Sequence, residues 1–355
     1  MKSLRMSGVA AAAALLASMA VSLPAVAAEN GLQRYSPGVG GSDMTAPLVP
    51  GWYFQLPFVA YHANKYKGND GQQSKVNTPL PVTQAGPGGP RATTLVDASA
   101  TNIALLPRLT YLSTDQFLGG NLGVTAMLPL VKRRAHFAAA GTTIPGVGTV
   151  TSPAAVQNAI GGQTGGETGI GDLEISPVIH WELSDSQTVT VAPTVVAPTG
   201  DYNASQRVNT GYGNFYTFRP SVQYAFIGDG WDVGARAVMS FNTRNKDTGY
   251  LSGNIFNLDY QLMKFVSEDL RLGLQGYFVR QLSADTCTTG APAATQCTTL
   301  NLIDGNKMSV NAAGPAFGWI KNGGEMMIEA KVLREYKARN RFEGAAFWLT
   351  LSKPL

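Results

Sequence analysis

Charged residues are scarce in this chain. Asp, Glu, Lys and Arg make up 14% of its 355 residues, against about 25% in ordinary soluble domains. The two signs are also nearly balanced, because 25 basic residues face 23 acidic ones once Lys2 and Arg5 near the N-terminus are set aside. No cluster of Lys and Arg stands out, so the sequence pI near 9.0 does not predict a nucleic-acid partner.

Long apolar runs are missing too, with one exception near the N-terminus. Two basic residues precede an apolar stretch over residues 9–23, and "LPAVAAEN" then offers the small residues that a signal peptidase reads. This pattern predicts a Sec signal peptide over residues 1–28, cleaved after Ala28 or Ala27. An uncleaved anchor helix is the alternative, which Pro24 and the short apolar core disfavour. Beyond this segment no run reaches about 18 apolar residues, so any membrane crossing is expected to use strands.

Cysteine is nearly absent. Cys287 and Cys297 are the only two, and export to an oxidising compartment favours a disulfide that closes the short loop between them. A two-cysteine metal site is the alternative, but no His lies nearby to complete it. We therefore expect no metal and no other cofactor.

What the sequence does have is an alternation of apolar and polar residues at period two. In "GDLEISPVIHWELS", Leu173 and Ile175 alternate with Asp172 and Glu174. The same pattern recurs from "WYFQLPFVAY" to the closing "GAAFWLTLSKPL", in about twelve segments. Their length is close to the ten residues or so that a tilted transmembrane strand requires.

The connections between these segments alternate between short and long. The short turns are "STDQFLGG", "SDSQ", "IGDG", "VSED" and "KNGG". The longer links cover residues 62–100, 132–169, 201–215, 242–253, 283–306 and 336–341. Outer-membrane barrels show this alternation, with the short turns in the periplasm. Four tryptophans fall beside the predicted periplasmic ends, where an aromatic girdle is expected: Trp52, Trp181, Trp231 and Trp319.

These patterns predict an all-β protein, a transmembrane antiparallel up-and-down β-barrel of about 12 strands over residues 51–355. In hydrocarbon every backbone N–H and C=O must pair within the protein, so a sheet must close on itself. The predicted location is the outer membrane of a Gram-negative-type bacterium. A soluble β-sandwich is the alternative, but such long strands on a regular meander would be unusual there. Residues 29–50 are rich in Gly and Pro and lack the alternation, so we expect them to be periplasmic or to plug the lumen.

Charged and polar residues on the inward faces are candidate lumen residues. Asp172 and Glu174 could bind Ca²⁺ or line a pore, but an internal network of ion pairs with the inward arginines is the simpler interpretation. The candidates are Arg108, Asp172, Glu174, His180, Glu182, Arg219, Arg236, Asp259, Arg271, Glu329 and Lys331.

No enzymatic activity is expected. The chain has three histidines, His62, His136 and His180. Only His180 has a carboxylate, Glu182, on the same strand face, and Ser176 lies too far along an extended chain to bond it. No G-x-S-x-G motif is present. "GGQTGGETGIG" lacks the Lys and the helix pattern of a phosphate loop, and it predicts a flexible link.

Several stretches together resemble a known family. "GETGIGDLEISPVIHW", "VAPTGDYN", "NTGYGNFYTFRPSVQYAF", "NTRNKDTGYLSGNIFNLDY" and "GYFVRQLSAD" follow in an order and at spacings that resemble the outer-membrane proteins of the MetA (meta) pathway of phenol degradation. The start "ENGLQRYSPGVGG" followed by "PGWYF" is similar too, so the resemblance covers essentially residues 29–355. The chain departs from the usual terminal aromatic of outer-membrane barrels by ending in "LSKPL", and the cysteine loop is a local feature.

The resemblance implies an outer-membrane barrel that passes small hydrophobic, including aromatic, compounds inward without an energy source. The expected partners are outer-membrane lipid, the barrel-assembly machinery and the solute. The alternative is a structural or surface-interaction barrel whose links at 63–100 and 133–169 contact partners. Those links hold few aromatic residues, which argues against a binding hot spot.

Overall fold

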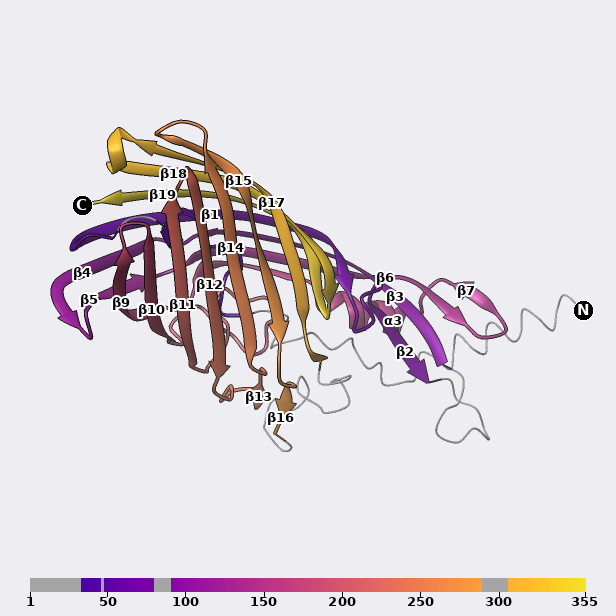
Figure 1. Ribbon diagram of the computed structural model, residues 1–355. Coiled ribbons are helices and arrows are strands. Elements are labelled where there is room, and N and C mark those ends of the chain that lie inside the picture. The colour runs from indigo at the N-terminus through magenta and orange to yellow at the C-terminus, as the bar shows by residue number, and fades with distance from the viewer. Residues whose placement is uncertain (1–32, 46–47, 80–90, 289–305) are drawn as a thin grey trace, which may run out of the picture.

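The computed structural model describes residues 33–45, 48–79, 91–288 and 306–355. One antiparallel sheet closes into a barrel of twelve spans, because the last strand pairs with the first. The predicted fold is therefore confirmed (Figure 1). Along the chain the spans are β1 (Gly51–Lys67), β3 (Arg91–Leu105) with β4 (Arg108–Phe117), β5 (Gly120–Met127) with β6 (Leu130–Ile144), β8 (Gly165–Ile170) with β9 (Glu174–Ser184), β10 (Gln187–Val196), β11 (Thr217–Gly228), β12 (Trp231–Asn242), β14 (Ile255–Phe265), β15 (Leu270–Gln281), β17 (Ser309–Lys321), β18 (Met326–Arg339) and β19 (Arg341–Pro354).

Three neighbouring spans are interrupted at the same level of the barrel wall. β3 and β4 pair with successive parts of β1, so they form one span that breaks at Leu106 and Pro107. The next span breaks at Pro129, and proline has no N–H to give to the sheet. Single bonds hold the wall together there: the N–H of Leu106 donates to the carbonyl of Pro57 at 2.8 Å, and that of Gly171 donates to the carbonyl of Pro129 at 2.7 Å.

The barrel is polar inside and apolar outside. On β14, Asp259 and Gln261 are at most 2% exposed, whereas Leu262 next to them is 48% exposed. On β11, Val222 is 52% exposed and its neighbour Gln223 is 7% exposed. A soluble barrel would bury the apolar residues instead, so the outer surface fits hydrocarbon. Among the described residues, no helix is long and apolar enough to cross a membrane.

One end of the barrel carries the short turns; we call it the short-turn end. It holds residues 118–119, 185–186, 229–230, 266–269 and 322–325, together with the start of β1 and the end of β19. Trp52 and Trp231 face outward here, 47% and 39% exposed, and Trp319 is 36% exposed. Aromatic rings at this level match the girdle that an interface between lipid and water favours.

The opposite end, which we call the long-link end, is more ordered than the sequence indicates. β2 (Lys75–Pro79), β7 (Gly148–Val150) and helix α3 (Ala154–Gly161) lie beyond the barrel (Figure 1). Val156 and Ile160 of α3 are buried in a small apolar cluster with Phe137 of β6. Strands therefore continue well into the segments predicted as links.

Two predictions about the links are wrong. Residues 336–341 are not a longer link, because only Asn340 separates β18 from β19, in a left-handed backbone conformation with a φ of 51°. The stretch "GGETGI" is not a flexible link but strand β8, paired with β6. Backbone hydrogen bonds suffice to extend a sheet there, even where side chains are small.

A charge on the outer face tests the lipid environment. Val222→Arg in the middle of β11 should lower the free energy of unfolding by about 2–4 kcal/mol, since the bilayer midplane disfavours Arg most. The matched change Tyr216→Arg, one residue before β11 at the long-link end, should cost about 0–1 kcal/mol. Urea unfolding in lipid vesicles measures both, and equal costs at the two depths would contradict a hydrocarbon surface.

Candidate functional site: a plugged lumen with a solute chamber

The N-terminal segment from Gln33 to Thr45, which we call the plug, lies inside the ring of strands. Its centre is held by Asp259 of β14, whose carboxylate is fully buried. Asp259 accepts hydrogen bonds from the hydroxyl of Tyr35 at 2.7 Å and from the N–H groups of Gly38 and Gly40 at 3.0 and 2.9 Å. A buried carboxylate needs such donors, so Asp259 fixes the plug backbone in place.

Small residues let the plug approach the wall this closely. A Cβ atom at Gly40 would lie 2.8 Å from Oδ2 of Asp259, and one at Gly41 would overlap the carboxylate of Glu329. Lys331 donates a hydrogen bond to the carbonyl of Gly40 at 2.5 Å. A side chain at Gly40 would press on the Asp259 carboxylate of β14, and one at Gly41 would displace the ends of the Glu329 and Lys331 side chains of β18.

The start of the plug is anchored by Arg34. Its guanidinium forms an ion pair with Asp172 at 2.9 Å, and both side chains are 1% exposed. Arg34 also donates to the carbonyl of Gly213 and stacks over the ring of Phe215, 3.9 Å from the ring centroid. Asp172 accepts a further bond from the N–H of Gly200, so this anchor joins the plug to the links at the long-link end.

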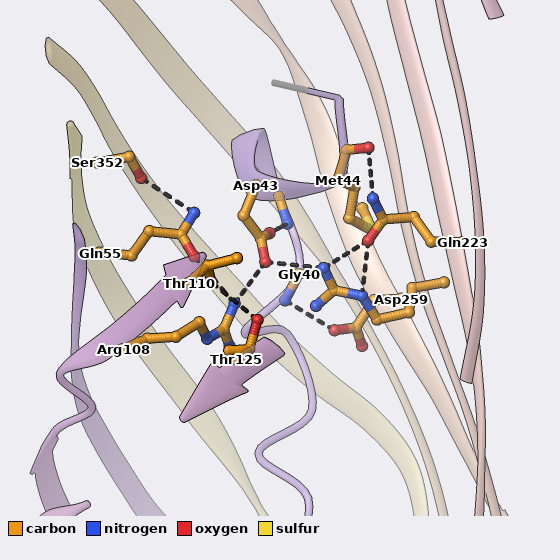
Figure 2. A network of polar contacts seen from close by, with 12 residues as sticks. Gly40, Asp43, Met44, Gln55, Arg108, Thr110, Thr125, Gln223, Asp259 and Ser352 are labelled. Carbon is orange, nitrogen blue, oxygen red and sulfur yellow. Dashed lines mark hydrogen bonds and ion pairs between the residues drawn. The ribbon is translucent and has the colours of Figure 1, made fainter. Parts of the chain in front are cut away.

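The end of the plug is the single helical turn α2 (Ser42–Thr45), which carries Asp43. Oδ2 of Asp43 lies 2.8 Å from Nη1 of Arg108 on β4 and 2.8 Å from Nη2 of Arg236 on β12. Figure 2 shows the carboxylate of Asp43 pointing toward the side chain of Arg108. We call this arrangement the Asp43 latch, because one carboxylate ties α2 to two separate strands of the wall.

The charge on Asp43 is stabilised where it lies. Burial raises the pKa of this carboxyl, but the positive charges of Arg236 and Arg108 outweigh burial and hold the pKa below its usual range. The folded-state pKa is thus depressed, so the latch stabilises the docked plug at neutral pH. That contribution is lost only as the pH falls below the ordinary carboxylate range.

A cavity of about 420 Å³ lies between the plug and the wall, and we call it the chamber. The Asp43 latch forms one side of it, and Ile320, Met327 and Lys353 at the short-turn end border it as well. Its volume falls within the roughly 300–1,000 Å³ that small-molecule sites occupy. The lining combines apolar side chains such as Val178, Ala192 and Val238 with hydroxyl and charged groups.

Many polar groups of the chamber wall are already paired with one another. Thr110 and Thr125 share a hydrogen bond of 2.8 Å, and Ser176 and Thr194 share one of 2.7 Å. Arg219 forms an ion pair with Glu174. Because these groups satisfy each other, the wall offers a less polar surface than its composition suggests.

The structure places the candidate lumen residues as follows. Arg271 forms an ion pair with Asp232, and Lys331 forms one with Glu329 at 3.1 Å. Nδ1 of His180 lies 2.8 Å from Oγ1 of Thr190. Glu182 is exposed, while the other ten candidates are buried or half-buried and lie in the plugged interior: Arg108, Asp172, Glu174, His180, Arg219, Arg236, Asp259, Arg271, Glu329 and Lys331.

Sequence reasoning missed three parts of the site. Asp43 and Tyr35 stand in a segment without periodicity, so only the rarity of charge in that segment could have marked Asp43. Glu335 of β18 is not among the candidates; it accepts hydrogen bonds from the hydroxyls of Tyr61 and Tyr277, each at 2.8 Å.

The remaining sequence candidates do not form a metal-binding cluster in the described part of the chain. Within it, no group of three or more His, Cys, Asp and Glu residues could hold a metal ion. His62 is exposed and lies 3.3 Å from the hydroxyl of Thr101, and His136 lies 3.5 Å from that of Thr164. Cys287 belongs to the short strand β16 (Thr286–Cys287), and Cys297 lies outside the described residues, so their pairing stays a prediction.

Removing the plug tests its role. Deletion of residues 33–45 should raise the single-channel conductance in planar bilayers several-fold, because the lumen loses the segment that fills it. A matched control shortens the β6–β7 hairpin by deleting residues 145–147, which lie beyond the barrel and should leave the conductance unchanged. Equal conductance of the plug deletion and the full chain would contradict the assignment.

The chain is similar in fold to several solved structures. An outer membrane channel from Pseudomonas putida F1 aligns over 89% of this chain and 100% of its own, with 14% identity and a TM-score of 0.63. The translocator domain of the autotransporter NalP from Neisseria meningitidis aligns over 88% and 92%, with 8% identity and a TM-score of 0.44. A channel named CymD monoaromatic hydrocarbon channel aligns over 94% and 98%, with 7% identity and a TM-score of 0.40. The last two are too distant to bear on this chain's function.

No curated protein sequence matches the chain. The first of these structures shows that the fold is that of an outer-membrane barrel. A family profile matches residues 83–351, which include most of the barrel and most of the strands that line the chamber. The chain therefore belongs to the family described as "Putative MetA-pathway of phenol degradation".

Proposed function

We propose that this protein is an outer-membrane channel for the passive uptake of small, largely apolar solutes, aromatic compounds among them. The observation that carries the proposal is the chamber: a cavity of about 420 Å³, inside the barrel, between a docked plug and a wall of mixed polarity. Membership of a family named for phenol degradation supports aromatic solutes. The outer-membrane channel with the same fold supports a transport role.

The chamber suits an apolar solute better than a hydrophilic one. Its serine and threonine hydroxyls already have partners within the protein, and four of them pair with each other, so a bound solute need not replace water at each of them. Apolar residues such as Val178, Ala192 and Val238 then supply the contact surface. A polar solute would have to give up its hydration shell without a matching set of free partners.

The proposal also covers how the chain is exported and which partners it contacts. The chain carries a signal peptide that is cleaved after residue 28 or 27, and it is inserted into the outer membrane of a Gram-negative-type cell by the barrel-assembly machinery. It contacts outer-membrane lipid through its apolar belt, and it catalyses no reaction. The competing proposal is a structural or surface-interaction barrel, for which the ordered extension of β2, β7 and α3 is the supporting observation.

A variant that fills the chamber distinguishes the channel from the structural or surface-interaction barrel. Ala192→Trp on β10 places a large ring in the chamber and should slow the uptake of a neutral alkylbenzene several-fold. Val191→Trp on the same strand points the same ring toward lipid and should leave uptake unchanged. Initial uptake of radiolabelled ethylbenzene by porin-deficient cells that express each variant at equal barrel levels measures the difference.

Equal uptake by the two variants and by cells without the protein would favour the structural barrel. Growth of the source cell on limiting aromatic carbon, with and without the gene, is a second readout. An unchanged growth rate there would also count against transport.

A further inference from the structure

The Asp43 latch contains two positive charges and one negative charge. Arg108 and Arg236 both contact the single carboxylate of Asp43, while Arg219 is matched by Glu174. The chamber is thus lined by three guanidinium groups and two carboxylates, with Lys353 at its border. Asp259, a further carboxylate near Arg236, is not in the chamber lining and already receives three hydrogen bonds from the plug.

The two arginines are held in place without Asp43. Arg108 donates through Nη1 to Oε1 of Gln55 at 3.2 Å, and Arg236 donates through Nε to Oε1 of Gln223 at 3.0 Å. Their side chains are 14% and 13% exposed, so both guanidinium groups reach the chamber. Two such groups that converge on one point match the geometry of a carboxylate.

The plug itself is held in two independent ways. Residues 35–40 are fixed by Asp259, and Arg34 is fixed by Asp172. α2 is held by the Asp43 latch, by single bonds from Gln261 to Thr45 at 3.0 Å and from Gln223 to the carbonyl of Met44 at 2.8 Å, and by the buried side chain of Met44. Loss of the ion pairs would remove the charged part of this attachment and leave residues 34–40 docked.

We propose that the chamber is a binding site for apolar carboxylates, in which the solute's carboxylate takes the place of Asp43 on Arg108 and Arg236. The exchange releases α2 from the wall and widens the lumen next to the solute. This inference rests on the proposed function and names its substrate class: a small apolar body, such as an aromatic ring, that bears one carboxylate. The released Asp43 moves toward the water at the short-turn end.

The exchange conserves the charge pairing of the site. A solute carboxylate accepts the same two charge-assisted hydrogen bonds that Asp43 accepts, so no buried charge is left without a partner. A neutral analogue cannot make this replacement. It fills the apolar part of the chamber and leaves the latch closed. The site therefore prefers a carboxylate over a neutral solute of the same size.

Binding to the purified full chain in lipid nanodiscs tests the proposal, with benzoate and the neutral analogue benzyl alcohol as probes. Asp43→Asn removes the internal competitor and should tighten benzoate binding several-fold in calorimetry. Arg236→Gln removes half of the site and should weaken benzoate binding about tenfold or more. Benzyl alcohol should respond to neither change. Asp70→Asn, which breaks the exposed ion pair of Asp70 with Lys75, is the matched control and should change nothing.

A spin label at Val49, attached by non-cysteine chemistry, reports on the segment that follows α2. Benzoate should mobilise this label, and benzyl alcohol should not.

The proposal is overturned if Asp43→Asn weakens benzoate binding or leaves it unchanged, because the latch then does not compete with the solute. It is equally overturned if benzoate and benzyl alcohol bind alike in every variant. Arg236→Gln bears on folding as well, so the gain of affinity in Asp43→Asn is the decisive result. A failure here leaves the proposed function testable, since the uptake of ethylbenzene through the chamber needs no carboxylate.

Discussion

The closed ring of backbone hydrogen bonds is the constraint on which the rest of this structure depends. Hydrocarbon offers no partner to an N–H or C=O group, so the sheet must return to its first strand, as β19 does to β1. Closure in turn divides every strand into a face toward lipid and a face toward the interior. The apolar residues take the outer face, and the polar and charged residues are left to pair within a narrow lumen.

That interior explains why a plug is needed and how it is held. Asp259 and Asp172 are buried carboxylates whose hydrogen-bond partners come from the plug or the neighbouring links. A buried charge without partners would cost several kcal/mol, so the wall and the plug stabilise each other. The chamber is the volume that this arrangement leaves unfilled, beside the single helical turn that carries Asp43.

Most of the fold could be predicted from the sequence, because period two is a direct consequence of one face toward lipid. Val222 and Leu262 lie outward and Gln223 and Asp259 lie inward as the alternation indicates. The breaks at Pro107 and Pro129 were not predicted, since the apolar pattern continues across them. The tight turn at Asn340 and the strand β8 were also missed, because turns and glycine-rich strands depend on backbone pairing rather than on side-chain pattern.

The site was less accessible to sequence reasoning for a physical reason. The alternation predicts which residues point inward, but not which of them meet across the lumen, and it does not apply to the plug. The Asp43 latch joins residues that are 65 and 193 positions apart along the chain. Such contacts follow from the closure of the ring and from the path of an aperiodic segment.

The inside-out arrangement is tested most directly by magnetisation transfer from lipid acyl chains to labelled methyl groups in nanodiscs. Val222 and Leu274 are 52% and 56% exposed, whereas Val238 and Leu333 are at most 1% exposed. We expect cross-peaks between lipid and the methyl groups of the first two, and none to those of the last two. Transfer to Val238 and Leu333 with none to Val222 and Leu274 would contradict the account.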